Sequence, residues 1–145
     1  MTNKFMYFIA NWKMFGDIKS LNSLNKVIKF SKTNKNNKFK LIYCPPYTLL
    51  KTFYNKVKNS NTSIGAQNCH SNSDYGAFTG SINAKLIKST GAKYIILGHS
   101  ENRNNGETDL SINKKIHSAL KENLIVIICI GEKLSEKKKK RLTKS

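Results

Sequence analysis

The sequence is poor in acidic residues, arginine, proline and cysteine. Its 145 residues hold 8 acidic residues against 26 basic ones, and only two of the basic residues are arginine. Arginine makes the bidentate contacts that recognise phosphates and bases, so its scarcity argues against a nucleic-acid-binding surface despite the net charge of +18. The 24 lysines and 18 asparagines are spread along the chain, as an A-rich coding sequence would produce. We therefore predict no specific nucleic-acid partner.

Cysteine is too rare, and too irregularly placed, to predict a disulfide framework. The three cysteines are an odd number and none belongs to a C-x-x-C motif, so we expect reduced, buried thiols at Cys44, Cys69 and Cys129. The adjacent pair Cys69 and His70, with the distant His117, is only a weak pattern for metal binding. We expect no metal and no cofactor.

Long hydrophobic runs are also absent. The N-terminal apolar run Phe5–Ala10 has six residues, whereas a membrane span needs roughly 18. No small-residue cleavage pattern follows it, so it does not read as a signal peptide. The apolar content of 39% is nevertheless enough for a core. We predict a cytoplasmic protein with no membrane partner.

Short apolar runs alternate with helical periodicities along the chain. The runs are continuous, which is typical of strands covered on both faces of a parallel sheet. Strands alternating with helices indicate right-handed βαβ units, and hence the α/β class. Strands are predicted at Phe5–Ala10, Phe39–Tyr43, Ser63–Ala66, Tyr94–Leu97 and Leu124–Ile130. Helices are predicted at Ile18–Phe30 after a cap at Asp17, at Tyr47–Val57, at Ser81–Ser89, and at Leu110–Glu122 after a cap at Thr108 or Asp109.

Two segments depart from this alternation. The polar segment Gln67–Gly80 is longer than most connections, and such loops are usually functional or disordered. Residues 133–145 contain seven basic residues and no apolar stripe, so we divide the chain into a barrel-like part, 1–132, and a lysine-rich tail. The run Lys137–Lys140 suggests a frameshift or premature stop as the origin of this tail.

Four short motifs carry a resemblance to a known family. They are Asn11–Met14 (NWKM), Gly76–Gly80 (GAFTG), Gly98–Glu101 (GHSE) and Cys129–Glu132 (CIGE). In this order and spacing they resemble triose-phosphate isomerase over about residues 5–132. The resemblance implies a partial TIM (β/α)8 barrel, with about five of the eight strands in this chain.

The resemblance implies interconversion of dihydroxyacetone phosphate and glyceraldehyde 3-phosphate through an enediol, a step of glycolysis and gluconeogenesis. The substrate is an anion and its carbonyl oxygen gains charge, so the reaction needs a fixed cation and an electrophile. The resemblance assigns the cation to Lys13, an orienting amide to Asn11 and the electrophile to His99. A neutral imidazole paired with a glutamate base is the arrangement established for triose-phosphate isomerase itself.

The resemblance also implies supporting roles. Glu101 would orient and balance the lysine, and Ser100 would act through its backbone N–H. Thr79 would form the tip of a loop that reaches into a second subunit, which implies a homodimer. Each feature taken singly also has a simpler interpretation, and these alternatives remain open. Lys13 could be an ordinary exposed lysine, His99 a structural histidine at a strand end, and Gly76–Gly80 a flexible turn.

Part of the family pattern is missing. Asn102 stands where the family usually has an arginine, although Arg103 keeps the second one. The base glutamate and lid follow strand six of the family, and its phosphate-binding segments follow strands seven and eight. We therefore expect this chain to be inactive alone and to leave two unpaired sheet edges. A non-catalytic basic binding module and a gene remnant are the alternatives.

Overall fold

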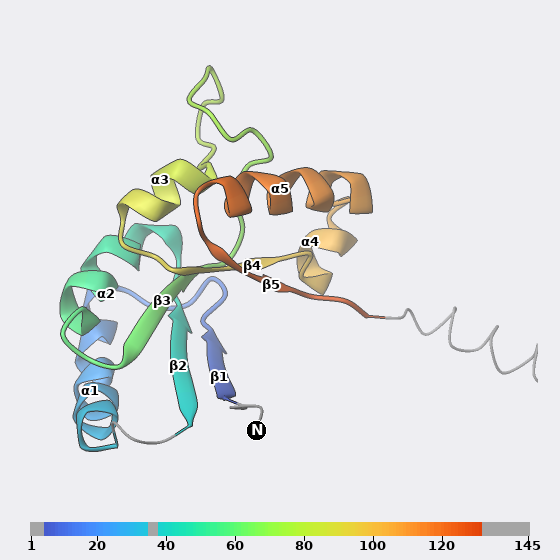
Figure 1. Cartoon of the computed structure of the whole chain (residues 1–145). Helices are drawn as coiled ribbons and strands as arrows, with labels where there is room; N and C mark the ends of the chain where they lie inside the picture. The colour runs from blue at the N-terminus through green and yellow to red at the C-terminus, as the bar shows by residue number, and fades with distance from the viewer. Residues whose placement is uncertain (1–4, 35–37, 132–145) are drawn as a thin grey trace, which may run out of the picture.

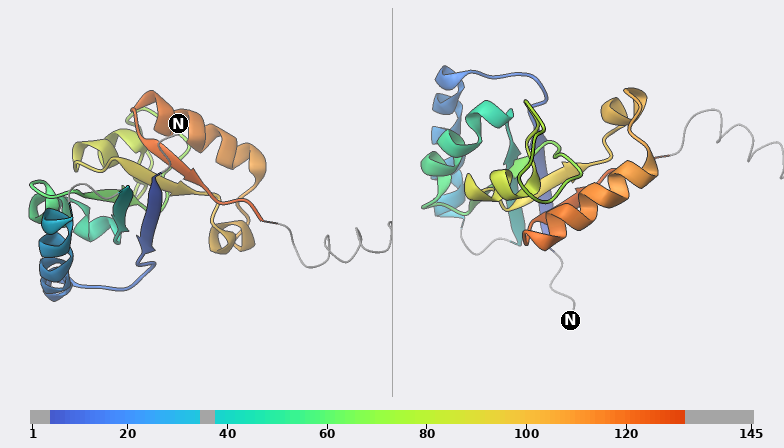
Figure 2. Two further views of the ribbon diagram at one scale, coloured as in Figure 1. Left: turned by 60° about the horizontal axis from the view of Figure 1, so that its bottom comes forward. Right: turned by 90° about the horizontal axis from the view of Figure 1, so that it is seen from above.

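The computed structural model describes residues 5–34 and 38–131. Five parallel strands form one sheet in the order β1-β2-β3-β4-β5, and the sheet curls into a half-barrel with helices on its outside (Figures 1 and 2). The expected tail at 133–145 lies outside the described residues, as does Glu132 of the fourth motif. The strands are β1 (Met6–Asn11), β2 (Phe39–Cys44), β3 (Thr62–Ala66), β4 (Tyr94–Leu97) and β5 (Ile125–Ile128).

The helices connect successive strands, as the alternating pattern predicts. Among the described residues none of them is long and apolar enough to cross a membrane. They are α1 (Leu24–Thr33), α2 (Leu50–Val57), α3 (Ala84–Ser89), α4 (Ser100–Asn104) and α5 (Asp109–Lys121), with 3₁₀ helices η1 (Ile18–Ser23) and η2 (Tyr47–Leu49).

Local capping explains where the helices differ from the predicted ranges. Asp17 and Ser20 form a reciprocal capping box that tightens the first turn into η1, so the predicted Ile18–Phe30 helix is split in two. Asn83 accepts a hydrogen bond from the backbone N–H of Leu86 at 2.9 Å, so α3 begins three residues later than predicted.

Alternation along the strands divides the apolar residues between the two faces of the sheet. Ile64 and Ala66 on β3 pack with helical residues such as Phe53 of α2, and they belong to the core between the sheet and its helices. Tyr94 and Ile96 on β4 belong to a second cluster on the concave face, together with residues such as Ile42 of β2 and Ile127 of β5. The half-barrel therefore has one core under the helices and a second, smaller cluster inside the curl.

The two edge strands carry the exposed apolar residues that unpaired sheet edges imply. All four residues of β4 are buried, as predicted. By contrast, Met6 on β1 is 63% exposed and Ile128 on β5 is 47% exposed. β1 and β5 are exposed because they lie at the two ends of the sheet, where each has one neighbouring strand in the described residues. These two edges are the open sides of the half-barrel.

Because all five strands are parallel, their carboxyl ends lie along the same rim of the sheet. β1 ends at Asn11, Gln67 follows β3, and His99 follows β4 and Gly98. Strands β2 and β3 approach closely at Gly65, where an added Cβ would lie 2.7 Å from the Cys44 Sγ atom. The rim therefore brings together polar residues that are far apart in the sequence.

Candidate active site

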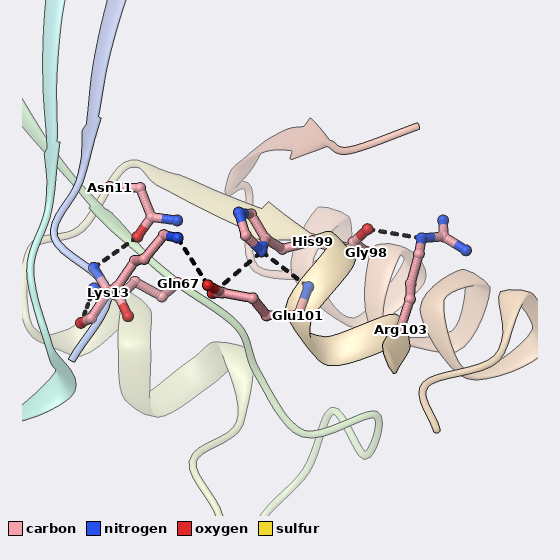
Figure 3. Close-up of polar contacts among 7 residues, drawn as sticks. All are labelled: Asn11, Lys13, Gln67, Gly98, His99, Glu101 and Arg103. Atoms are coloured by element: carbon pink, nitrogen blue, oxygen red, sulfur yellow. Dashed lines mark hydrogen bonds and ion pairs between the residues drawn. The ribbon is translucent and has the colours of Figure 1, made fainter. Parts of the chain in front are cut away.

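Lys13 follows β1 in a backbone conformation that lysine rarely adopts. Its φ is +53°, in the left-handed region, which costs of order 1–3 kcal/mol for a residue with a side chain. Two hydrogen bonds hold it there (Figure 3). The Lys13 N–H donates to Asn11 Oδ1 at 2.9 Å, and Gln67 Nε2 donates to the Lys13 carbonyl at 2.8 Å. The fold therefore fixes the direction of this lysine by straining its backbone.

Gln67 is a residue of the site that the sequence reasoning missed. Its side-chain amide donates to the carbonyls of both Lys13 and Cys44, each at 2.8 Å, and so ties the ends of β1, β2 and β3 together. The position of Gln67 in the sequence could have indicated that it belongs to the site. Gln67 opens the long polar segment immediately after β3, at the rim where Lys13 and His99 also lie.

His99 caps the short helix α4 with its ring. The Nδ1 atom accepts the backbone N–H of Glu101 at 3.3 Å, and the side chain is 25% exposed. A ring nitrogen that accepts a hydrogen bond carries no proton, so in the neutral imidazole the proton sits on Nε2. This contact presents Nε2 as the hydrogen-bond donor of the ring.

Glu101 joins the lysine to the histidine. Its Oε1 accepts from Lys13 Nζ at 2.7 Å, and its Oε2 lies 3.5 Å from His99 Nδ1 (Figure 3). The hydrogen bond from Lys13 lowers the pKa of the Glu101 carboxyl, and desolvation opposes this shift. The charge of Lys13 adds to the lowering of the pKa, as does the charge of His99 when its imidazole is protonated. Lys13 and Glu101 are both about half exposed, so this pair orients more than it stabilises.

These side chains line a single pocket of about 240 Å³. Its size suits a small molecule, and its polar groups converge from the ends of different strands. The pocket contains four of the predicted site residues and four that the sequence reasoning did not assign to the site, Gln67 among them. It is lined by Asn11, Lys13, Tyr47, Gln67, Asn68, His99, Glu101 and Asn102.

Two predicted residues lie apart from this pocket. Ser100 is the exposed first residue of α4 and lines the neighbouring space beside β5 instead. Thr79 is exposed on the loop between β3 and α3, which projects away from the sheet (Figure 1). The roles of Ser100 and Thr79 stay predictions.

The lowered pKa of Glu101 gives the site a testable pH dependence. An acid whose folded pKa is depressed stabilises the folded state above its ordinary value, here 4.5, and loses that contribution as pH falls through the lowered pKa. We expect Lys13→Met to return the Glu101 pKa toward 4.5, as followed by NMR titration of the carboxyl carbon. Lys19→Met, which removes an exposed lysine of η1, is the control. Identical Glu101 titrations in both variants and the parent would contradict the assigned contact.

The weak metal pattern finds no geometric support in residues 5–34 and 38–131, where no three His, Cys, Asp or Glu side chains gather around a common point. Burial raises the pKa of the Cys69 thiol to about 11, which disfavours the thiolate that a metal would need. The neighbouring His70 packs its ring on Phe78 and accepts the backbone N–H of Asn72. The three cysteines are free, as expected; Cys44 is buried as well, but Cys129 is only partly buried, contrary to expectation, because it lies just after the edge strand β5.

The fold belongs to the class of parallel (β/α) barrels, of which the described residues form a half-barrel with a polar pocket at its strand ends. The sequence model of the family described as Triosephosphate isomerase matches residues 6–145. The chain belongs to this family.

Individual relatives agree with the family match. The Triosephosphate isomerase of Alkaliphilus oremlandii is 40% identical over 129 residues, which cover 88% of this chain and 51% of that protein. The enzyme of Bartonella henselae is 37% identical over 137 residues, covering 93% and 54%. The crystal structure of triosephosphate isomerase from Bartonella henselae superposes with a TM-score of 0.84 over 94% of this chain and 56% of that one, at 35% identity. The chain thus spans about half the length of the relatives it matches.

Proposed function

We propose that this chain supplies one half of a triose-phosphate isomerase site, namely the half that binds, orients and polarises the substrate. The reaction interconverts dihydroxyacetone phosphate and glyceraldehyde 3-phosphate through an enediol, as a step of glycolysis and gluconeogenesis in the cytoplasm. The observation that carries the proposal is the convergence of Lys13 and His99 on one pocket from the ends of β1 and β4.

Lys13 supplies the fixed positive charge. Its ammonium group has three N–H donors, and one of them is bonded to Glu101. The remaining donors can take the anionic substrate, because Lys13 lines the pocket and its backbone is held at both its N–H and its carbonyl. A cation fixed in advance stabilises developing negative charge without reorganising during the reaction.

His99 supplies the electrophile. Its Nε2–H is free to donate to the substrate carbonyl, since Nδ1 is already bonded to the Glu101 N–H. A donor at this position stabilises the oxyanion of the enediol-like transition state. The proton on the neighbouring carbon must be removed by a base, and the family places that glutamate after its sixth strand, beyond the five strands described here. We propose that the rest of the family fold supplies it, together with the lid and the phosphate-binding segments.

We propose further that the assembly is a homodimer through the loop carrying Thr79. The loop is organised before any partner arrives. His70 N–H donates to the Ile82 carbonyl across its base at 2.8 Å. The buried Asn83 side chain donates to the carbonyls of Ser73 and Asp74. A loop held in shape loses little conformational freedom on docking into a second subunit.

Complementation tests the proposal. The purified chain is mixed with a polypeptide carrying the part of the Alkaliphilus oremlandii enzyme that the chain does not match, and isomerase turnover is measured with a coupled dehydrogenase. We expect no turnover from either polypeptide alone, and turnover together with two copies of each polypeptide by size exclusion from the mixture. Fusing residues 1–131 to the same polypeptide removes any dependence on association. A folded fusion without isomerase turnover would overturn the proposed function.

A further inference from the structure

Arginine at position 103 is an exception to the composition of this chain. Of the 26 basic residues 24 are lysine, and Arg103 is the arginine that lies in the described ranges. Lysine presents a point charge, whereas arginine presents a planar fork with donors at fixed separations. An arginine in so lysine-rich a chain indicates a position where the planar fork of donors makes contacts that a lysine could not make.

The fork of Arg103 reaches three different elements. Its Nε donates to the Gly98 carbonyl at the end of β4, at 2.7 Å. Its Nη1 pairs with the Asp109 carboxylate at the start of α5, at 2.6 Å. Its Nη2 donates to the Cys129 carbonyl just after β5, at 3.4 Å. A lysine ammonium group cannot meet these three acceptors at once, because its donors all radiate from one nitrogen.

The side chain of Arg103 holds the backbone before His99, and the backbone of residue 103 holds the peptide bond after it. The Gly98 carbonyl belongs to the peptide bond that precedes His99, and the Arg103 side chain holds it (Figure 3). The backbone N–H of Arg103 donates to the His99 carbonyl at 3.1 Å, which fixes the peptide bond that follows. Gly98 itself has φ +70°, and a Cβ there would lie 3.0 Å from Arg103 Nη2. Glycine thus leaves room for the guanidinium group.

We propose that Arg103 is the positioning residue of His99. Its side chain acts through the peptide plane that precedes the histidine, so that the ring meets the Glu101 N–H with Nδ1 and turns Nε2 toward the pocket. Its meaning for catalysis rests on the proposed isomerase function. The contact between the Arg103 side chain and the Gly98 carbonyl does not depend on that function, so spectroscopy can test it without any measurement of turnover.

The test uses the full chain and its Arg103→Lys variant. In the parent we expect the ¹⁵N spectrum of His99 to show a single tautomer with the proton on Nε2, and a slowly exchanging Glu101 amide. In Arg103→Lys we expect a mixture of tautomers and exchange of that amide about tenfold faster, comparable to the loss of one hydrogen bond. Melting by circular dichroism, measured on both, separates loss of positioning from loss of fold.

Asp109→Asn is the matched control, because the Asp109 side chain is 90% exposed and both carbonyl contacts of Arg103 remain. We expect it to leave the His99 tautomer unchanged. The parent alone gives a second measurement that does not depend on any variant folding. Its Arg103 Nε–H should be protected and its guanidinium rotation slow. A freely rotating guanidinium group in the parent, or a parent-like His99 signal in Arg103→Lys, would overturn the proposal.

Discussion

Replacing His99 with glutamine is expected to lower kcat of the complemented isomerase about 10²–10³-fold, the range seen when one donor to a developing oxyanion is removed. Glutamine can still reach a backbone N–H, but it does not place an imidazole Nε2–H at the same point in the pocket. The melting temperature should change little, since the only side-chain hydrogen bond of His99 in the described structure is to the nearby Glu101 N–H. Coupled turnover and circular dichroism, measured on the same preparation, provide both quantities.

His117→Gln is the matched control for this prediction. His117 lies on the exposed face of α5, outside the pocket, so the same substitution can be made there without changing the pocket. The two variants therefore share any general effect of a His-to-Gln substitution. Equal turnover in His99→Gln and His117→Gln would remove His99 from the catalytic residues, while leaving the family assignment untouched.

Two of the four motifs, Asn11–Met14 and Gly98–Glu101, come together at one pocket because the fold is a regular one. Residues placed immediately after parallel strands must lie on a common rim, whatever their separation in the sequence. Lys13 and Glu101, 88 residues apart, meet at 2.7 Å for this reason. The strand ranges needed only local patterns, because continuous apolar runs such as Tyr94–Leu97 are distinctive.

What the sequence could not predict depends on contacts between distant side chains. Nothing near Gln67 indicates that its amide will hold the carbonyl of Lys13, because that contact is set by how β1 and β3 converge. Nor does a pattern of apolar residues tell how exposed a strand will be. Phe8 on β1 sits in an apolar run yet is 53% exposed, because exposure depends on the number of neighbouring strands.

The pairing of Lys115 with Glu107 is a second contact that local patterns do not indicate. The two residues lie eight apart, outside the three- and four-residue spacings at which side chains meet on a helix. Their side chains are only 13% and 7% exposed. Lys115 Nζ donates to Glu107 Oε1 and also to Asn68 Oδ1, at 3.0 Å for the second contact. Asn68 lines the pocket, so this ion pair is connected to the site through the Asn68 side chain.

Lys115→Met should therefore destabilise the fold strongly. It removes the only described cation paired with a buried carboxylate whose Oε2 already lacks a hydrogen-bond partner within the described residues. Leaving one charge of a buried pair uncompensated costs about 3–5 kcal/mol, a large share of the roughly 5–15 kcal/mol by which domains are stable. Urea unfolding followed by circular dichroism measures the loss.

The double variant Lys115→Met with Glu107→Leu separates loss of the charge balance from loss of packing. Replacing both members of a buried pair with apolar residues is often neutral or stabilising, so the double variant should be more stable than Lys115→Met alone. Lys114→Met, which changes the exposed neighbour on the same helix, should stay within about 0.5 kcal/mol of the parent. If Lys115→Met unfolded at the same urea concentration as Lys114→Met, the ion pair would not be a buried support of the site. If the double variant were no more stable than the single one, the cost would come from lost packing around Lys115, because neutralising Glu107 would then have brought no relief.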